Sequence, residues 1–408
     1  MKKIIFIVFL TGILSLPGLS FLGSGKAEAD PGVTDNEILI GVSTVLTGGF
    51  AADGVDTKKS IDLFLDQINA AGGIHGRKLK VIYEDDAYNA TKGVAAVRKL
   101  IELDKVFCII GPGGSPPALA ARPIIEKEGV PTICVMSLYN SLVDPHTKYL
   151  FQFNITSYGE TEILCDHIKN TYQSKKAGVL VVKGEYGASM MGTLEPALKK
   201  RGITIEITET APMGSPDYTT QWLRIKAANP DFVILALLGR DSGVGIRQAR
   251  ELGVTQKVFG TSLLNMVGVA PTAGKAIEGV EFVSNMPGSP DFPKGKFKEY
   301  MDAFRAKYPE VAIKDMGTAS MMPYGAMSCV AEAMRRAGKD LTREKFIMAL
   351  ESLRDYDPVT TVPITFTSTD HRGMKYNTVL RYDSEGRRTF LAGPLKLTSE
   401  PPITPAPK

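Results

Sequence analysis

Residues 37–86 read EILIGVSTVLTGGFAADGVDTKKSIDLFLDQINAAGGIHGRKLKVIYEDD, and this stretch decides the fold class of the chain. It opens with an apolar run at 37–42 that is typical of a buried strand. A helix follows, because apolar residues recur at helical spacing in Ile61, Phe64, Leu65 and Ile68. Gly72-Gly73 ends that helix, and a second apolar strand follows at 79–83. A strand, a helix and a strand in this order predict a parallel βαβ unit.

The same alternation of strands and helices continues along most of the chain. A helix is predicted around 94–101, and a loop rich in Gly and Pro at 111–116 leads into another. The alternation restarts with a helix near residue 160, so two successive doubly wound units predict an α/β fold with two lobes. Further strands are predicted at 106–110, 130–135, 177–182, 203–207 and 232–237, near Val258 and Val280, and, as antiparallel strands, at 363–366 and 379–382.

The N-terminus has the order of a secretory signal peptide. Lys2 and Lys3 precede an apolar run at 4–22, and the small-residue tripeptide Ala27-Glu28-Ala29 follows it. The run is long enough for an uncleaved membrane anchor, but the tripeptide favours cleavage of residues 1–29. We therefore expect an exported chain in the periplasm or on the extracytoplasmic face.

Composition and charge bear on the partners of the chain and on the state of its cysteines. The formal net charge is +4 over 408 residues, and no polybasic block is present, so no nucleic-acid partner is expected. The four cysteines have apolar neighbours, which favours buried thiols, although disulfides stay open in an oxidising compartment. They are Cys108, Cys134, Cys165 and Cys329.

No motif predicts catalysis, a cofactor or a metal. Residues 187–191 lack the last glycine of a nucleophile elbow, and no Gly-Lys-Ser/Thr phosphate-binding loop occurs. Cys165 and His167 lie two positions apart on a predicted helix, which is a poor spacing for a shared metal ion. The sequence therefore predicts a binding protein and not an enzyme.

Five motifs carry a resemblance to a known family. They are Leu46-Thr47-Gly48, the string INAAGGIHGR at 68–77, Glu84-Asp85-Asp86, Gly113-Gly114-Ser115 and Tyr186-Gly187. In this order they resemble the leucine/isoleucine/valine-binding family of periplasmic receptors for ABC transporters, and the similarity runs from about residue 36 to 395. The resemblance implies the type I periplasmic binding fold, in which two Rossmann-like lobes joined by a three-crossing hinge enclose a ligand.

The resemblance also implies lobe boundaries. Lobe one would comprise 30–153 and 286–360, and lobe two 154–285 and 361–398, with crossings near Phe153, Asn285 and Val362. Residues 399–408 are expected to form a loose tail.

Gly114 and Ser115 form the most informative part of the expected ligand site. Ligands of parallel sheets bind at the carboxyl ends of the strands, where the glycine lets the backbone approach closely. Ser115 precedes Pro116, which predicts a helix N-cap whose free N–H groups suit a carboxylate. The resemblance implies that Ser115 grips a ligand carboxylate, and the alternative is that Ser115 only caps its helix.

The resemblance extends the site to both lobes. It implies that Ser137 and Tyr139 meet the same carboxylate and that Tyr186 closes over the ligand from lobe two. Ser262 stands where the family usually has an acid for an ammonium group. Asp53, where the family often has an aromatic wall, and Asp241 can replace that acid, although each also suits a helix cap or a solvated charge.

These residues predict a monomeric receptor for a small molecule that serves the membrane permease of an ABC importer. The expected ligand is a branched-chain amino acid or a related small carboxylate or amide, and Ser262 favours the latter. Two alternatives stay open, namely a sensor of the same fold that reports to a membrane partner and an exported amidase or hydrolase.

We predict that the mature protein starts at Asp30, because the small-residue tripeptide ends at Ala29. N-terminal sequencing of exported material checks this. Recovery of chains that still begin at Met1 would favour the anchor instead.

Overall fold

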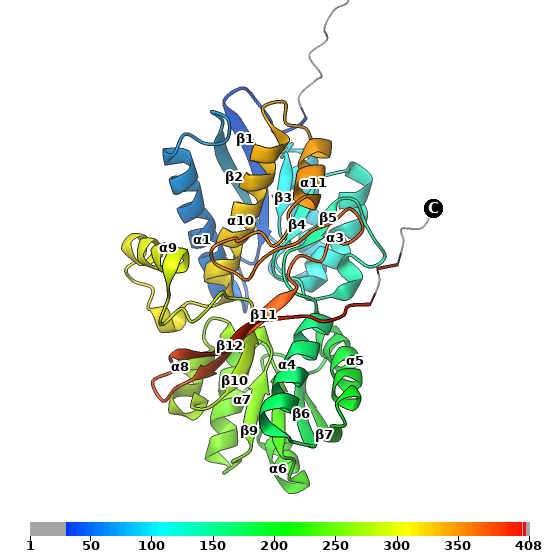
Figure 1. The fold of residues 1–408 in the computed structure, drawn as a ribbon, viewed down its shortest axis with the longest axis vertical. Coiled ribbons are helices and arrows are strands. Elements are labelled where there is room, and N and C mark those ends of the chain that lie inside the picture. The colour runs from blue at the N-terminus through cyan, green and yellow to red at the C-terminus, as the bar shows by residue number, and fades with distance from the viewer. Residues whose placement is uncertain (1–29, 402, 405–408) are drawn as a thin grey trace, which may run out of the picture.

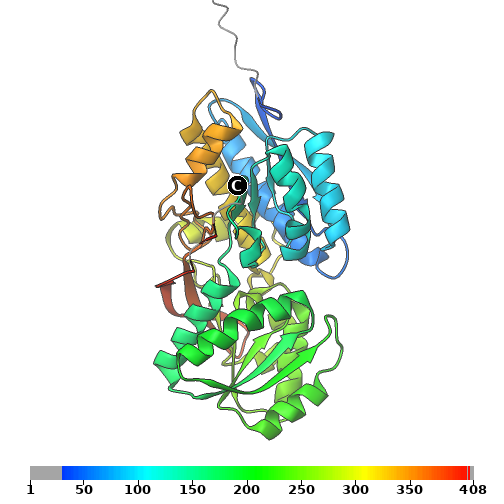
Figure 2. The same ribbon diagram turned by 90° about the vertical axis from the view of Figure 1, so that its right-hand side faces the viewer.

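The computed structural model describes residues 30–401, 403 and 404, and it consists of two α/β lobes stacked along the long axis (Figures 1 and 2). The predicted signal peptide lies outside the described residues. The first lobe contains a parallel sheet of five strands in the order β2-β1-β3-β4-β5. Its strands are β1 (Glu37–Thr44), β2 (Lys78–Asp85), β3 (Cys108–Ile110), β4 (Thr132–Cys134) and β5 (Leu150–Gln152).

Helices cover both faces of this sheet because alternate residues of each strand point to opposite sides. In β1, Ile38 and Ile40 belong to the core beneath α1, whereas Leu39 packs against the core beneath α2 and α3. The helices of lobe one are α1 (Ala51–Ala70), α2 (Ala90–Glu102), α3 (Ser115–Glu128), α9 (Gly295–Lys307), α10 (Thr318–Ala337) and α11 (Arg343–Glu351).

The second lobe contains a sheet of seven strands in the order β12-β11-β10-β9-β8-β6-β7. Strands β6 to β10 pair in parallel, and β11 and β12 are added antiparallel. The strands are β6 (Lys176–Val182), β7 (Thr204–Ala211), β8 (Phe232–Ala236), β9 (Lys257–Gly260), β10 (Glu281–Ser284), β11 (Tyr376–Tyr382) and β12 (Arg388–Lys396). The helices are α4 (Ser157–Tyr172), α5 (Glu185–Lys200), α6 (Thr219–Ala228), α7 (Arg240–Glu251) and α8 (Val269–Ala273). The prediction of two doubly wound lobes is confirmed.

One predicted strand is wrong. Residues 363–366 form only isolated bridges, from Ile364 to Tyr356 and to Met374. Pro363 has no N–H group to donate, so a regular ladder cannot start there. The sequence prediction also lacked β12, whose alternation is interrupted by Gly393-Pro394 and by a bulge in its pairing with β11.

The three segments at which hinge crossings are predicted, near Phe153, Asn285 and Val362, lie side by side. The Val362 N–H donates to the Asn285 carbonyl at 2.9 Å, and Asn285 Nδ2 donates to Asn154 Oδ1 at 3.3 Å. Residues 363–374, however, return to lobe one, because the Gln152 N–H bonds the His371 carbonyl and the Gly373 N–H bonds the Gln152 carbonyl. The chain therefore enters lobe two only at about Lys375, and not at Val362 as expected.

The expectation of a loose tail is wrong for its described part. Glu400 pairs with Lys375 and accepts a hydrogen bond from Thr156 Oγ1 at 3.2 Å. Farther along, Thr404 bonds Asp144 of lobe one through its N–H at 2.9 Å and His146 through its carbonyl at 2.8 Å. The tail thus runs from β12 back across the hinge to lobe one (Figure 1).

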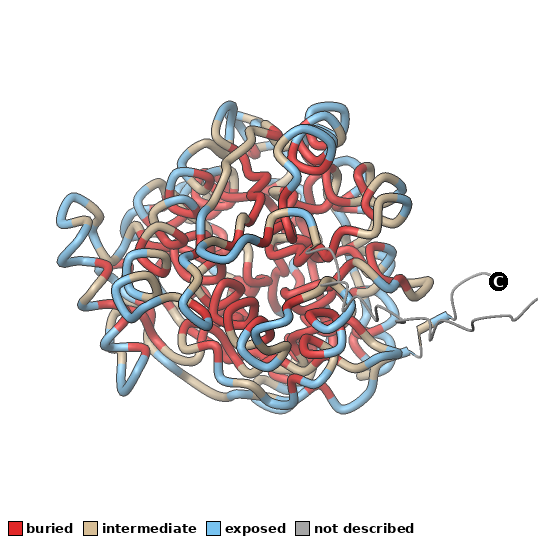
Figure 3. The backbone as a smooth tube through the Cα atoms, turned by 90° about the horizontal axis from the view of Figure 1, so that it is seen from above, coloured by how far each residue is buried: buried red, intermediate tan, exposed pale blue. Residues whose placement is uncertain are grey.

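Buried residues fill the interior of the molecule and exposed ones its rim (Figure 3). All four cysteines are buried and free, as the buried-thiol interpretation predicted. Burial raises the pKa of Cys108 to about 12, so the thiol stays protonated. None of the helices that the structure describes combines the length and the apolar character required to cross a bilayer.

We predict that Glu400→Gln lowers the free energy of unfolding by about 1.5–3 kcal/mol, the usual size for a hydrogen bond to a charged group. The physical reason is that the Glu400 carboxylate is largely buried against Lys375 and Arg372. Denaturant unfolding measures the change. Glu385→Gln, in the exposed turn between β11 and β12, is the control and should change stability by less than about 0.5 kcal/mol. Equal stability of both variants would contradict a docked tail.

Candidate ligand-binding site

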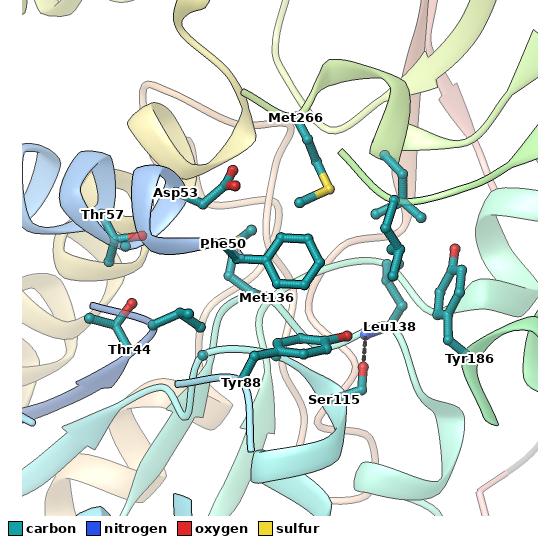
Figure 4. Close-up of a pocket in the computed structure, with 16 residues that line it drawn as sticks. Thr44, Phe50, Asp53, Thr57, Tyr88, Ser115, Met136, Leu138, Tyr186 and Met266 are labelled. Carbon is teal, nitrogen blue, oxygen red and sulfur yellow. Dashed lines mark hydrogen bonds between the residues drawn. The ribbon is translucent and has the colours of Figure 1, made fainter. Parts of the chain in front are cut away.

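A cavity lies between the lobes, at the carboxyl ends of β1, β3, β4 and β8 (Figure 4). Its volume is about 80 Å³ when counted as space open to the centres of water molecules. One water needs only about 10–15 Å³ on that measure, so the cavity can admit a small organic molecule. Lobe one contributes Thr44, Val45, Phe50, Asp53, Gly54, Thr57, Tyr88, Gly113, Gly114, Ser115, Met136 and Leu138, and lobe two contributes Tyr186, Leu238, Leu263 and Met266.

Ser115 lies at the floor of this cavity and does not cap its helix. The N-cap of α3 is Gly114, and Ser115 is the first helical residue. Ser115 Oγ instead accepts hydrogen bonds from the Leu138 N–H at 3.1 Å and from Ser137 Oγ at 3.2 Å. Both of its lone pairs are therefore occupied, and its own O–H is left as a donor for a ligand. The capping alternative is wrong.

The expected cluster of free N–H groups at this helix end is smaller than predicted. The Gly113 N–H donates to Asp86 Oδ2 at 2.7 Å, and the Gly114 N–H donates to the Pro112 carbonyl at 2.8 Å. Pro116 and Pro117 have no N–H group. Within the described part of the chain, only the Ser115 N–H lacks a protein acceptor at this end, so Ser115 provides both available donors.

Gly114 is required by its neighbour Tyr88. The backbone of Gly114 has φ +125°, and a Cβ at this position would lie 2.4 Å from the Tyr88 ring. That ring packs against Phe50, with a centroid distance of 4.9 Å. Gly114 thus lets an aromatic wall of the cavity close down on the loop before α3, and the prediction missed Tyr88 and Phe50 because neither lies in a recognisable motif.

The acidic pair Asp85-Asp86 at the end of β2 shapes the loops of the site. Asp85 accepts from the Leu46 N–H at 2.8 Å and the Ala87 N–H at 2.9 Å, which fixes the loop after β1. Asp86 accepts from Ser43 Oγ at 2.8 Å as well as from Gly113. The Asp85-Asp86 motif therefore holds the loops after β1 and β3 in place through backbone amides.

Ser137 and Tyr139 lie behind Ser115 and not on the cavity surface. Ser137 is buried and donates to Ser115, while its carbonyl accepts from Gln152 Nε2 at 3.2 Å. Tyr139 is buried as well, and its hydroxyl has no protein partner among the described residues. Ser137 can thus orient Ser115 without touching a ligand itself.

Lobe two brings Tyr186 to the cavity but not Asp241 or Ser262. Tyr186 lies in the first turn of α5, and its hydroxyl is buried with no hydrogen bond to a described residue within 3.5 Å. Asp241 lines a wider outer cleft and accepts from the Gly214 N–H at 2.6 Å. Ser262 is buried, and its N–H donates to Glu160 Oε1 at 3.2 Å.

Glu160 is an acidic residue near the site that no sequence motif indicates. It lies on α4, is fully buried, and its Oε2 has no partner within the part of the chain that the structure describes. Burial raises its pKa from 4.5 to about 7. Glu160 therefore places a carboxyl group beside the loop in which the resemblance leads one to expect an acid, yet it comes from a distant element and does not line the cavity.

Asp53 lies where the cavity opens into the outer cleft, because it lines both spaces. It belongs to the first turn of α1, and its Oδ1 is buried with no partner among the described residues. Burial, and then the charge of Asp56, raise the pKa of Asp53 to about 7. A hydrogen bond from the Val267 backbone of lobe two to the Asp53 carboxylate lowers the pKa and partly opposes this shift.

The sequence profile described as "Periplasmic binding protein" matches residues 37–387. The chain belongs to the periplasmic binding protein family. It is 27% identical over 268 residues to the "Amino acid binding protein" of Pseudomonas aeruginosa, covering 65% of this chain and 70% of that one. This is a family of solute-binding proteins and not of enzymes.

Two solved structures show the same fold in proteins named for different cargoes. LivJ of Streptococcus pneumoniae, a branched-chain amino acid transporter substrate-binding protein in complex with isoleucine, superposes with a TM-score of 0.77 at 22% identity, over 87% of this chain and 99% of that one. A fatty acid ABC transporter substrate-binding protein from Thermomonospora curvata superposes with a TM-score of 0.76 at 23% identity, over 89% of this chain and 93% of that one. The shared fold therefore does not determine the ligand.

We predict that Glu160→Gln changes the pH dependence of stability. The folded protein keeps the Glu160 proton up to about pH 7, whereas the unfolded chain releases it near the ordinary value of 4.5. The wild-type carboxyl therefore lowers the free energy of unfolding as the pH rises through this window, by on the order of 3 kcal/mol, and glutamine does not. Urea unfolding in acid and at about pH 8 measures the difference.

The control for this prediction is Glu278→Gln at an exposed position. It should follow the wild-type curve at both pH values. Stability curves of Glu160→Gln that run parallel to those of the wild type would refute the role assigned to the buried carboxyl.

Proposed function

We propose that this protein is an extracytoplasmic receptor of an ABC importer, and that it encloses a branched-chain amino acid or a related small carboxylate or amide between its lobes. It acts as an exported monomer, hands its ligand to a membrane permease, and uses no cofactor. The observation that carries the proposal is Ser115, whose O–H and N–H are both available at the floor of a largely apolar interlobe cavity.

Two donors on one residue suit an oxygen-bearing group. A carboxylate or amide carbonyl can accept from both the O–H and the N–H of Ser115, and hydrogen bonds to a charged acceptor are the stronger ones. The surrounding walls of Met136, Leu138 and Leu238 offer contact for an apolar body. These features support a ligand with one acidic or amide end and a hydrocarbon or aromatic remainder.

An α-amino acid whose carboxylate binds Ser115 would find no acidic side chain there to pair with its ammonium group. Such a group would lie close to the ligand carboxylate, but Ser262 is buried outside the cavity, and Glu160 lies behind it. An unpaired buried cation costs several kcal/mol. Among the proposed ligands, a carboxylate or amide with an apolar body is therefore favoured over leucine and its relatives.

The lining of the cavity also supports binding without catalysis. The residues that line it include no His, Cys or Lys, and their one carboxylate, Asp53, lies at the other end of the cavity from Ser115 (Figure 4), so the lining gives the Ser115 hydroxyl no base. A nucleophilic serine requires such a base. The sensor alternative uses the same cavity, and no feature of the described residues favours it over transport.

Calorimetry with leucine, isoleucine, valine and phenylalanine, beside short aliphatic and aromatic acids and amides, tests the proposed function. Binding should raise the unfolding temperature, because a ligand at a hundredfold excess over Kd stabilises the folded state by about 2.7 kcal/mol. X-ray scattering should report a more compact particle with ligand. If none of these compounds binds, a receptor for small carboxylates and amides is excluded.

We predict that Ser115→Ala weakens binding of a carboxylate ligand by about 1.5–3 kcal/mol, or roughly 10- to 150-fold in affinity. The variant loses the hydroxyl donor that Ser115 offers to a ligand and also leaves the Leu138 N–H without its acceptor, which should cost about 1–3 kcal/mol of stability. Titration calorimetry on the folded variant checks the affinity. Thr57→Val, at another hydroxyl of the lining, is the matched comparison. An unchanged Kd in Ser115→Ala would show that Ser115 serves the loop alone.

A further inference from the structure

Asp53 is the one carboxylate among the residues that line the cavity. Its Oδ1 is buried and has no hydrogen-bond partner among the described residues. An ionised carboxylate in such surroundings is costly unless a donor or a cation meets it. The Val267 backbone N–H offsets part of this cost, and the unpartnered Oδ1 is the atom that a group from outside the protein chain can meet.

Asp53 and Ser115 lie at opposite ends of the cavity. In Figure 4 the Asp53 carboxylate lies near Met266, Ser115 lies below Leu138, and the Phe50 ring lies between the two ends. The intervening walls are apolar or aromatic. An α-amino acid carries its carboxylate and its ammonium on the same carbon, so it cannot reach both ends at once.

We propose that the cavity takes an elongated acid whose far end carries a basic amino group, with the carboxylate at Ser115 and the ammonium at Asp53. This inference rests on the proposed function and narrows its ligand class to acids in which an apolar chain separates the two charged groups. Asp53 is then the residue that discriminates such acids from plain carboxylates.

The charged side chains around Asp53 are of both signs. Asp56 lies one turn along α1 and adds negative charge, and it is itself held by Ser320 Oγ at 2.6 Å. Tyr88 packs from the loop after β2, and Met266 and Val267 from lobe two carry no charged side chain. Across the outer cleft, α7 presents Arg240, Asp241 and Arg247. The described structure shows no salt bridge from Arg240 to Asp53, so the carboxylate is not already neutralised by it.

The pH dependence of binding gives a signature of this arrangement. Burial holds the pKa of Asp53 at about 7 in the free protein, and an ammonium group favours the ionised form. The affinity for an amino acid of this kind should therefore rise about tenfold per pH unit up to about pH 7 and then level off. If Asp53 were protonated and donated to a ligand acceptor, affinity would instead fall above about pH 7.

The experiment compares 6-aminohexanoate, hexanoate and leucine by calorimetry, with shorter and longer unbranched ω-amino acids as a length series. We expect 6-aminohexanoate, or a neighbour in the series, to bind at least about tenfold more tightly than the plain acid of equal length at about pH 8. Asp53→Asn keeps the shape of the side chain without its charge, and should abolish that preference together with the pH dependence. Asp66→Asn, at the exposed end of the same helix, is the matched control and should preserve both.

The outcomes separate this inference from the function on which it rests. If leucine or hexanoate binds and no ω-amino acid is preferred, the receptor function stands and the elongated amino acid is excluded. If the preference survives in Asp53→Asn, the role of Asp53 is excluded, provided that thermal unfolding shows the variant to be folded. If none of the compounds binds or changes the unfolding temperature, both this inference and the carboxylate class of the proposed function are overturned.

Discussion

The hydrogen bond from the Val362 N–H to the Asn285 carbonyl, with the Asn285 side chain bonded in turn to Asn154, is the constraint on which the site depends. Asn154 follows the carboxyl end of β5, and Asn285 follows that of β10. Tying these residues together makes the carboxyl ends of the two sheets face each other. The loops after the remaining strands then converge on the cavity, which is where ligands of open parallel sheets bind.

The carboxyl groups near the cavity fall into two kinds. Asp85 and Asp86 are met by backbone amides and hydroxyls, so they act as fixed parts of the loops. Asp53 and Glu160 each keep a buried oxygen without a partner in the described structure, and burial raises the pKa of both to about 7. The first pair gives the site its shape, and the second pair makes it responsive to charge and pH.

The family resemblance and the geometry bear on different questions. Membership of the periplasmic binding protein family rests on a match to residues 37–387 and fixes the two-lobed receptor architecture. A branched-chain amino acid transporter protein and a fatty acid transporter protein superpose with nearly the same TM-score, so architecture alone leaves the cargo open. The cargo depends on a few side chains, and Ser262 and Asp53 stand where the resemblance leads one to expect other residues.

The sequence alone determined the local structure and the order of elements, because apolar periodicity, glycine stops and strand length act within short windows. It therefore predicted two doubly wound lobes and the loop before α3, and the resemblance led to the expectation that Ser115 belongs to the site. The tertiary structure decided what requires partners distant in the sequence. Ser115 is turned from a cap into a donor by Leu138, Gly114 is required by Tyr88, and Glu160 reaches the loop at Ser262 from another element. The same holds for the C-terminal tail, where Glu400 pairs with Lys375 and accepts a hydrogen bond from Thr156. Burial and pairing are properties of the folded chain, and no pattern along the sequence encodes them locally.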